Sequence, residues 1–289
     1  MSSPPLKPAI HSTLLEIARS FPGLLTYAPV GSHADATAPE ELHNDYDFVV
    51  VFDELPWGHY EAFASRLADA ARRLSRPDHL VYVEPRLGPI KPRGDTPTVS
   101  MLQPLIFTRR LMRDYIANAP FLTLAWSRYP TAFGLRLTAY DAIGFPTVAQ
   151  LLDARAGIRH YRQMARENAV IVLTPVNQDG HFARKREPYP VTEDLLLELY
   201  HSIVLRTMTN ALMVFAHDAS ETKRQELIDA FLRRFPQLEQ HRRLAEDLSR
   251  NQALAREGKP VACDLPAMRE QAMAFLDDLE AVCLDDPRR

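Results

Sequence analysis

The sequence predicts a mixed α/β domain followed by an all-helical domain. Short apolar segments rich in β-branched residues indicate strands at residues 24–30, 45–53, 79–83 and 98–107. After residue 108 the strand patterns thin out, and amphipathic patterns typical of helices follow from Thr192 onward. A length of 289 residues suits about two domains of ordinary size. We therefore expect an α/β domain over residues 1–146 and a helical bundle over residues 147–289.

Local signals place the elements of the first half. Residues 11–21 carry apolar side chains at helical spacing, and Pro22-Gly23 ends that helix. The segment DYDFVVVFD at 45–53 is the strongest strand signal in the chain, and a helix over residues 59–74 follows it. The last two strands are joined by residues 84–97, which are rich in Pro and Gly, so we expect these strands to form a hairpin.

The second half shows mainly helical signals. Thr192 precedes two acidic residues, a pattern typical of a helix N-cap. The β-branched run at 169–173 is short and is assigned to no element, and the first helix is expected to be interrupted near Gly157. The expected helices cover residues 147–166, 192–215, 220–235, 237–257 and 265–284.

Composition and charge exclude several classes of protein. Lys and Arg number 34 against 37 for Asp and Glu, so a net charge of -3 gives no electrostatic case for binding nucleic acid. The two cysteines, Cys263 and Cys283, form no C-x-x-C pair, so a structural zinc site is not expected. No apolar run approaches the ~20 residues of a membrane span, and residues 1–8 lack the apolar core of a secretory signal. We expect a reduced, cytoplasmic protein with neither a membrane nor a nucleic acid as partner.

One constellation of residues carries chemical information. Gly31-Ser32 follows a predicted strand, and Asp45-Tyr46-Asp47 begins the next one. Because side chains alternate along a strand, the two carboxylates point to the same face, about 7 Å apart. Such a pair repels unless a cation joins it, and Mg²⁺ prefers oxygen ligands of this kind together with nucleotide phosphates. A Gly-Ser turn lets backbone N–H groups and a hydroxyl approach a phosphate closely.

The stretch from Val30 to Asp47 resembles the nucleotidyltransferase superfamily that includes DNA polymerase β. The motif of that family is a hydrophobic residue, Gly-Ser or Gly-Gly, a gap of about ten residues, and then Asp-hydrophobic-Asp/Glu. Val30-Gly31-Ser32 and Asp45-Tyr46-Asp47 match it. An α/β core followed by helices is also similar to the small-molecule branch of the family, such as the aminoglycoside nucleotidyltransferases. The resemblance covers residues 10–116 by pattern and the helical half by architecture alone.

This resemblance implies a short mixed sheet and the transfer of a nucleoside monophosphate from a nucleoside triphosphate to a hydroxyl or amine of a small-molecule acceptor. Gly31 and Ser32 would hold the triphosphate, and Asp45 and Asp47 would bind Mg²⁺ and serve as catalytic residues. The metal would activate the acceptor and stabilise the departing pyrophosphate.

The chain departs from the family pattern at the third carboxylate. The family places that acid on the strand beside the Asp-x-Asp strand, and the expected position here is close to Gln103. An amide can offer one oxygen to a metal, but it carries no charge and cannot act as a base. Glu84, at the end of the neighbouring predicted strand, is a possible replacement, although an exposed strand-end glutamate is the plainer interpretation.

Other candidate residues lie farther along the chain. Lys91, and with it Arg93, could reach a triphosphate from the loop at 84–97. In the aminoglycoside enzymes a helical glutamate of the second domain acts as base, and Glu198 is the candidate for that role here. The segment FARKREPY at 182–189 is interpreted as a solvated loop, with a loop that grips phosphate as the alternative.

Two other functions remain open. The chain could be a degenerate nucleotidyltransferase that binds a nucleotide or a partner without chemistry, which the missing third acid favours. It could also be a toxin- or defence-type enzyme that modifies a protein or RNA. The net charge of -3 argues against RNA as the substrate of such an enzyme.

Overall fold

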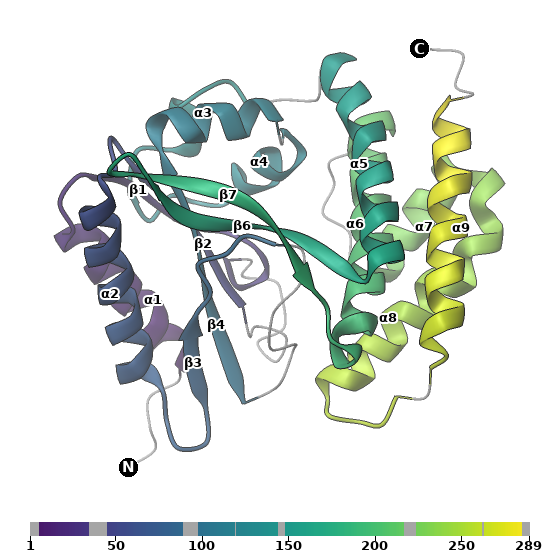
Figure 1. Cartoon of the computed structure of the whole chain (residues 1–289), viewed down its shortest axis with the longest axis horizontal. Coiled ribbons are helices and arrows are strands. Elements are labelled where there is room, and N and C mark those ends of the chain that lie inside the picture. The colour runs from purple at the N-terminus through teal and green to yellow at the C-terminus, as the bar shows by residue number, and fades with distance from the viewer. Residues whose placement is uncertain are drawn as a thin grey trace. The chain divides into compact units, whose positions relative to one another are not determined.

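The computed structural model of the chain describes residues 6–34, 45–88, 98–118, 120–143, 148–216, 224–261 and 263–284. Two compact units can be distinguished (Figure 1), and each is built from several stretches of sequence. The first unit comprises Met1–Leu87, Pro97–Ile143 and Leu173–Arg186. The second comprises Gly88–Thr96, Gly144–Val172 and Glu187–Arg289. The domain boundary expected at residue 146 lies outside the described residues and stays a prediction.

The first unit contains a five-stranded mixed sheet with the strand order β3-β4-β2-β1-β5. β2 pairs parallel with β4 and antiparallel with β1, so it lies in the middle of the sheet. The strands are β1 (Leu24–Pro29), β2 (Asp45–Phe52), β3 (Leu80–Val83), β4 (Val99–Thr108) and β5 (Phe133–Gly134). The helices of this unit are α1 (Leu6–Ser20), α2 (Trp57–Leu74), α3 (Arg109–Asn118) and α4 (Pro120–Trp126), with short 3-10 turns η1 (Ser32–Ala34) and η3 (Leu137–Ala139).

The elements predicted for residues 11–108 are confirmed, but the pairing of the last two strands is not. β3 and β4 pair in parallel, with Val81 beside Ser100 and Val83 beside Leu102, so the predicted hairpin is wrong. Parallel neighbours need a connection of a dozen or more residues, and the residues between Val83 and Val99 are enough to provide one. The Pro- and Gly-rich connection between β3 and β4 is therefore a crossover between parallel strands and not a hairpin turn.

Alternation along β2 separates two apolar layers. Phe48, Val50 and Phe52 face a core that α1 and α2 cover, whereas Val49 and Val51 face a second core that contains residues of α3 and α4. Figure 1 shows α1 and α2 side by side along the sheet. Because both faces of β2 are covered, almost the whole strand is apolar, as expected for a strand buried on two sides.

The second unit is organised around α6. This helix contacts every other helix that the structure describes in the unit, and its buried residues include Leu199, Ile203 and Val204. α5 runs without interruption through Gly157, contrary to the prediction, because one glycine costs a helix only about 1 kcal/mol. Thr192 occupies the N-cap position of the turn η4 (Glu193–Leu195) that precedes α6, but its hydroxyl makes no capping hydrogen bond. The helices of the unit are α5 (Val148–Glu167), α6 (Leu196–Ala216), α7 (Arg224–Arg234), α8 (Arg242–Arg256) and α9 (Leu265–Leu284), and the turn η5 (Pro236–His241) precedes α8.

The second half of the chain is not all-helical, because it contains a two-stranded hairpin. β6 (Ala169–Gln178) pairs with β7 (His181–Pro190). Asp179 and Gly180 form the turn with φ angles of 51° and 81°, the conformation that an Asp-Gly hairpin turn requires. The run at 169–173 is therefore the start of a strand, and the segment 182–189 is a strand and not a loop.

The tip of this hairpin belongs to the first unit and is bound there by main-chain hydrogen bonds. Trp57 N donates to Gly180 O at 2.8 Å, and Phe182 N donates to Leu55 O at 2.9 Å. Farther along, Leu87 and Leu173 exchange two main-chain hydrogen bonds at 2.8 and 3.1 Å. Among the helices in the described ranges, none is both long and apolar enough to cross a membrane.

Arg184 of β7 links the hairpin to strand β4 of the sheet through a hydrogen bond. Its guanidinium donates to the carbonyl oxygens of Ile106 at 3.0 Å and Leu173 at 3.3 Å. It also lies 5.3 Å from the ring centre of Phe182 and 6.0 Å from that of Phe107, within the range of cation–π attraction. Burial lowers the pKa of Arg184 to about 10, so the side chain remains a cation at neutral pH.

Replacing Arg184 by alanine is expected to lower the free energy of unfolding by about 2–3 kcal/mol, because the carbonyl oxygens of Ile106 and Leu173 lose charged donors. Urea unfolding measures the change. Arg186→Ala serves as the control, since Arg186 is an exposed residue of the same strand and its loss should cost less than about 0.5 kcal/mol. Equal effects of the two substitutions would contradict the role assigned to Arg184.

Candidate functional site

Asp45 and Asp47 begin the central strand of the sheet. They alternate with Tyr46 and Phe48, which belong to the core under α1 and α2, so both carboxylates lie on the opposite face. This confirms that the two acids share a face. Both residues are half-buried, and the Oδ1 atom of Asp45 is shielded from solvent. Polar side chains are tolerated at Asp45 and Asp47 because these residues lie at the first end of β2, where burial is incomplete.

The turn after β1 lies directly against Asp47. Val30 N donates to Asp47 O at 2.9 Å, which extends the pairing of the two strands to the end of β1. Gly31 follows with φ at 77°, and a Cβ atom placed on it would lie 2.8 Å from Oδ2 of Asp47. Both the backbone angle and the close approach therefore require glycine at this position. Ser32 then begins η1, which Ala34 N closes by donating to Gly31 O at 3.1 Å.

Gln103 lies where the sequence placed it, on the strand next to Asp47. The parallel register of β2 and β4 sets Asp47 opposite Gln103. The amide Nε2 of Gln103 donates to the main-chain oxygen of Arg86 at 3.2 Å. The neighbour of Asp47 on this strand is thus a neutral amide, one of whose donors is used inside the protein.

Glu84 does not replace the missing acid as a free carboxylate. It follows β3, its N–H donates to Leu102 O at 2.9 Å, and only 5% of the residue is exposed. Both of its carboxylate oxygens accept hydrogen bonds from the guanidinium of Arg86, from Nε at 2.7 Å and from Nη2 at 2.8 Å. The interpretation of Glu84 as an exposed strand-end residue is therefore wrong, because it forms a buried ion pair.

Arg86 is the residue of this region that sequence reasoning missed. Its guanidinium binds both carboxylate oxygens of Glu84 and its main-chain oxygen accepts the hydrogen bond of Gln103, so it links the end of β3 to the middle of β4. The sequence Glu-Pro-Arg at the end of a predicted strand is a signal that could have indicated this ion pair. The proline restricts the backbone between the two charged residues, which can bring the arginine side chain back toward the glutamate.

Two histidines support the same turn from the other side of β2. The ring of His33 in η1 lies 4.9 Å from the ring of Tyr46 and 5.1 Å from that of His11. Burial, and secondarily the charge of Lys7, lowers the pKa of His11. The imidazole of His11 is therefore neutral at pH 7, which suits its place in an aromatic cluster.

The remaining candidates are not brought to this site by anything in the structure. Lys91, like Arg93, lies outside the described residues. Glu198 lies in the first turn of α6 in the second unit, whereas Asp45 and Asp47 belong to the first. Its role as a base stays a prediction.

The residues present can be tested against the Mg²⁺ that the sequence pattern implies. Within the described part of the chain, no group of three or more His, Cys, Asp or Glu side chains could hold a metal ion. Mg²⁺ commonly takes only one or two carboxylates and completes its shell with water and substrate phosphates. Asp45 and Asp47 fit this mode of binding, in which two carboxylates hold the metal together with phosphates of the substrate.

Comparison with known proteins adds no assignment: no protein-family model matches the sequence, and no curated protein matches it.

Substituting Gly31 by alanine is expected to destabilise the fold through both backbone strain and the clash with Asp47. Gly180→Ala is the matched control, because Gly180 also has a positive φ, of 81°, but a Cβ there meets no atom within 4 Å. We expect Gly180→Ala to cost about 1–2 kcal/mol of unfolding free energy and Gly31→Ala at least about 1 kcal/mol more.

A second substitution isolates the contact. Asp47→Ala removes Oδ2 and leaves only a Cβ, 3.5 Å from the added methyl group. In that background the cost of Gly31→Ala should fall to that of Gly180→Ala when both are measured by urea unfolding. Equal costs of the two glycine substitutions in the unmodified chain would show that Asp47 does not constrain the turn.

Proposed function

We propose that the protein is a Mg²⁺-dependent nucleotidyltransferase that transfers a nucleoside monophosphate from a nucleoside triphosphate to a hydroxyl or amine of a small-molecule acceptor. One observation carries the proposal: Asp45 and Asp47 lie on one face at the start of the central strand, and the Gly31 turn packs against the carboxylate of Asp47. Carboxylates and a glycine turn in this order are what the motif of the superfamily requires.

The pair of acids is the part of the arrangement suited to a metal. Two carboxylates about 7 Å apart on a strand repel one another unless a cation lies between them. Asp45 and Asp47 would hold Mg²⁺, which when bound supplies charge neutralisation for the phosphates and activation of the acceptor. Their place on a strand covered on both faces restricts their movement.

The turn supplies the complementary part. Gly31 has no side chain, so a phosphate can approach its backbone closely, and Ser32 begins the short helical turn that follows. Asp47 holds this turn in place through the main-chain bond from Val30. The proton-accepting role of Glu198 and the triphosphate-binding role of Lys91 stay predictions from the resemblance, because Glu198 belongs to the second unit and Lys91 lies outside the described residues.

The ion pair between Glu84 and Arg86 has a separate consequence. Because both oxygens of Glu84 accept hydrogen bonds from Arg86, the proposed metal site consists of Asp45 and Asp47 without Glu84. The metal therefore depends on the phosphates for much of its coordination, and it should bind with the nucleotide and not before it.

Pyrophosphate release tests the proposal. The purified protein is incubated with Mg²⁺, each of the four common nucleoside triphosphates and a panel of hydroxyl- and amine-bearing acceptors. Asp47→Asn removes a charge at nearly constant volume and should lower the rate at least about 100-fold, or about 2.7 kcal/mol. Gln103→Ala should lower it less than about tenfold, since a neutral neighbour contributes less than a charged ligand.

Asp53→Asn is the matched control for this experiment. Asp53 follows the same strand at its other end and forms an exposed ion pair with Arg109, so its loss should leave the rate unchanged. Turnover that survives in the Asp45→Asn/Asp47→Asn double variant would refute the proposal.

A second function, nucleotide binding without chemistry, is favoured by a specific observation. Gln103 stands beside Asp47, and the nearby acid Glu84 is paired with Arg86. A binder of this kind would be stabilised by ATP with Mg²⁺, by about 2.7 kcal/mol at 100 times Kd, and would release no pyrophosphate. Stabilisation together with pyrophosphate release identifies the enzyme, and stabilisation alone identifies the binder.

A further inference from the structure

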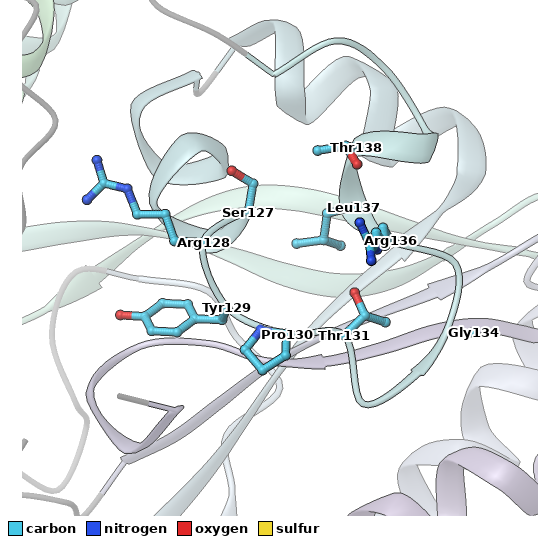
Figure 2. Close-up of a pocket in the computed structure, with 9 residues that line it drawn as sticks. All are labelled: Ser127, Arg128, Tyr129, Pro130, Thr131, Gly134, Arg136, Leu137 and Thr138. Carbon is cyan, nitrogen blue, oxygen red and sulfur yellow. The ribbon is translucent and has the colours of Figure 1, made fainter. Parts of the chain in front are cut away.

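A pocket of about 440 Å³ lies in the first unit, away from the paired acids in sequence (Figure 2). It is formed by residues 127–131 before the short strand β5, by Gly134 of that strand and by residues 136–138 after it. Its volume is within the range of pockets that take small ligands.

The walls of the pocket are fixed to the sheet by buried hydrogen bonds. The hydroxyl of Thr26, which is fully buried, donates to Leu135 O at 2.7 Å and accepts a hydrogen bond from Tyr140 Oη at 2.6 Å. Leu135 N in turn donates to Leu25 O at 3.0 Å. Gly134 lies so close to β1 that a Cβ on it would be 1.9 Å from Leu25 O, so this wall is held rigidly.

The pocket has an excess of hydrogen-bond donors and positive charge. The segment SRYPTAFGLRLTAY at 127–140 contains two arginines and no acidic residue. In the part of the chain that the structure describes, no carboxylate lies within ion-pair distance of Arg136, and the hydroxyls of Thr131 and Thr138 have no protein partner. Arg109, by contrast, is paired with Asp53. The guanidinium of Arg136 and the hydroxyls of Thr131 and Thr138 are therefore available to a ligand.

The arrangement of these donors points to the kind of ligand. In the view of Figure 2 the hydroxyls of Thr131 and Thr138 lie on opposite sides of the guanidinium of Arg136, while Arg128 and Tyr129 line another side. A guanidinium offers two parallel donors to an oxyanion, and phosphate has further oxygens for donors that come from other directions. The acceptor lone pairs of a carboxylate lie in one plane, whereas the oxygens of phosphate are arranged tetrahedrally, so phosphate suits donors from several directions better.

We propose that this pocket binds the phosphate group of a small molecule through the guanidinium of Arg136 and the hydroxyls of Thr131 and Thr138. Arg128 and Tyr129 then contact the remainder of the ligand. The site is independent of the proposed nucleotidyl transfer, because it uses neither the paired acids nor the Gly31 turn.

The test is a titration of the isotope-labelled full chain with sodium phosphate or with glycerol 3-phosphate, followed residue by residue in NMR spectra at constant ionic strength without metal. Saturable shifts are expected at the amides of Thr131, Gly134 and Thr138. Arg136→Gln should weaken binding at least about tenfold, and Thr131→Val about threefold, whereas Arg110→Gln, an exposed arginine outside the pocket, should change it less than twofold.

Each outcome decides the proposal. Tighter binding of glycerol 3-phosphate supports it and identifies a phosphate ester as the ligand, and equal binding supports it with free phosphate as the ligand. The absence of saturable binding overturns it, as do equal losses in Arg136→Gln and Arg110→Gln. Shifts that are strongest at residues 31–34 also overturn it, because they place the anion at the Gly31 turn.

Discussion

The burial of β2 on both faces is the constraint on which the first unit depends. Phe48, Val50 and Phe52 pack under α1 and α2, and Val49 and Val51 pack on the side of α3 and α4. No polar side chain fits into the middle of such a strand without a partner, because an unpaired buried polar group is costly. Charged residues can therefore occur only where the strand enters or leaves the sheet, and Asp45 and Asp47 stand at its entry.

The same constraint shapes the surroundings of the two acids. The turn at Gly31 lies against Asp47 because Val30 N donates a hydrogen bond to Asp47 O, which extends the pairing of β1 with β2. On the other side Gln103 is neutral, and the charge of Glu84 is balanced by Arg86. The edge of the sheet thus holds a pair of carboxylates with a glycine turn beside it, and the nearby acid Glu84 is paired with Arg86. This combination suits a cation that arrives with its own anionic ligands.

Sequence patterns predicted the helices and strands of residues 11–108, where each apolar pattern is distinct, but they assigned no element to residues 109–143, which contain α3, α4 and β5. They also placed both acids on one face and Gln103 beside Asp47. Pairing direction was missed, because the composition of a connection does not reveal whether the chain turns back or crosses over. The hairpin β6–β7 was missed because Arg184, Lys185 and Arg186 suggested a solvated loop, although Asp179-Gly180 is a strong turn signal. Arg184 is charged but partly enclosed, because its guanidinium contacts carbonyl oxygens and aromatic rings. These contacts come from tertiary structure and cannot be read from the local sequence.

Binding of Mn²⁺, a paramagnetic substitute for Mg²⁺, tests the central claim about Asp45 and Asp47 most directly. Free Mn²⁺ is measured by electron paramagnetic resonance with the protein alone, with each nucleoside triphosphate, and with the Asp45→Asn/Asp47→Asn variant. The account predicts weak binding of Mn²⁺ to the protein alone, much tighter binding of Mn²⁺ with a nucleotide, and loss of that gain in the variant. A gain of the same size in the variant would show that the metal and the nucleotide bind elsewhere.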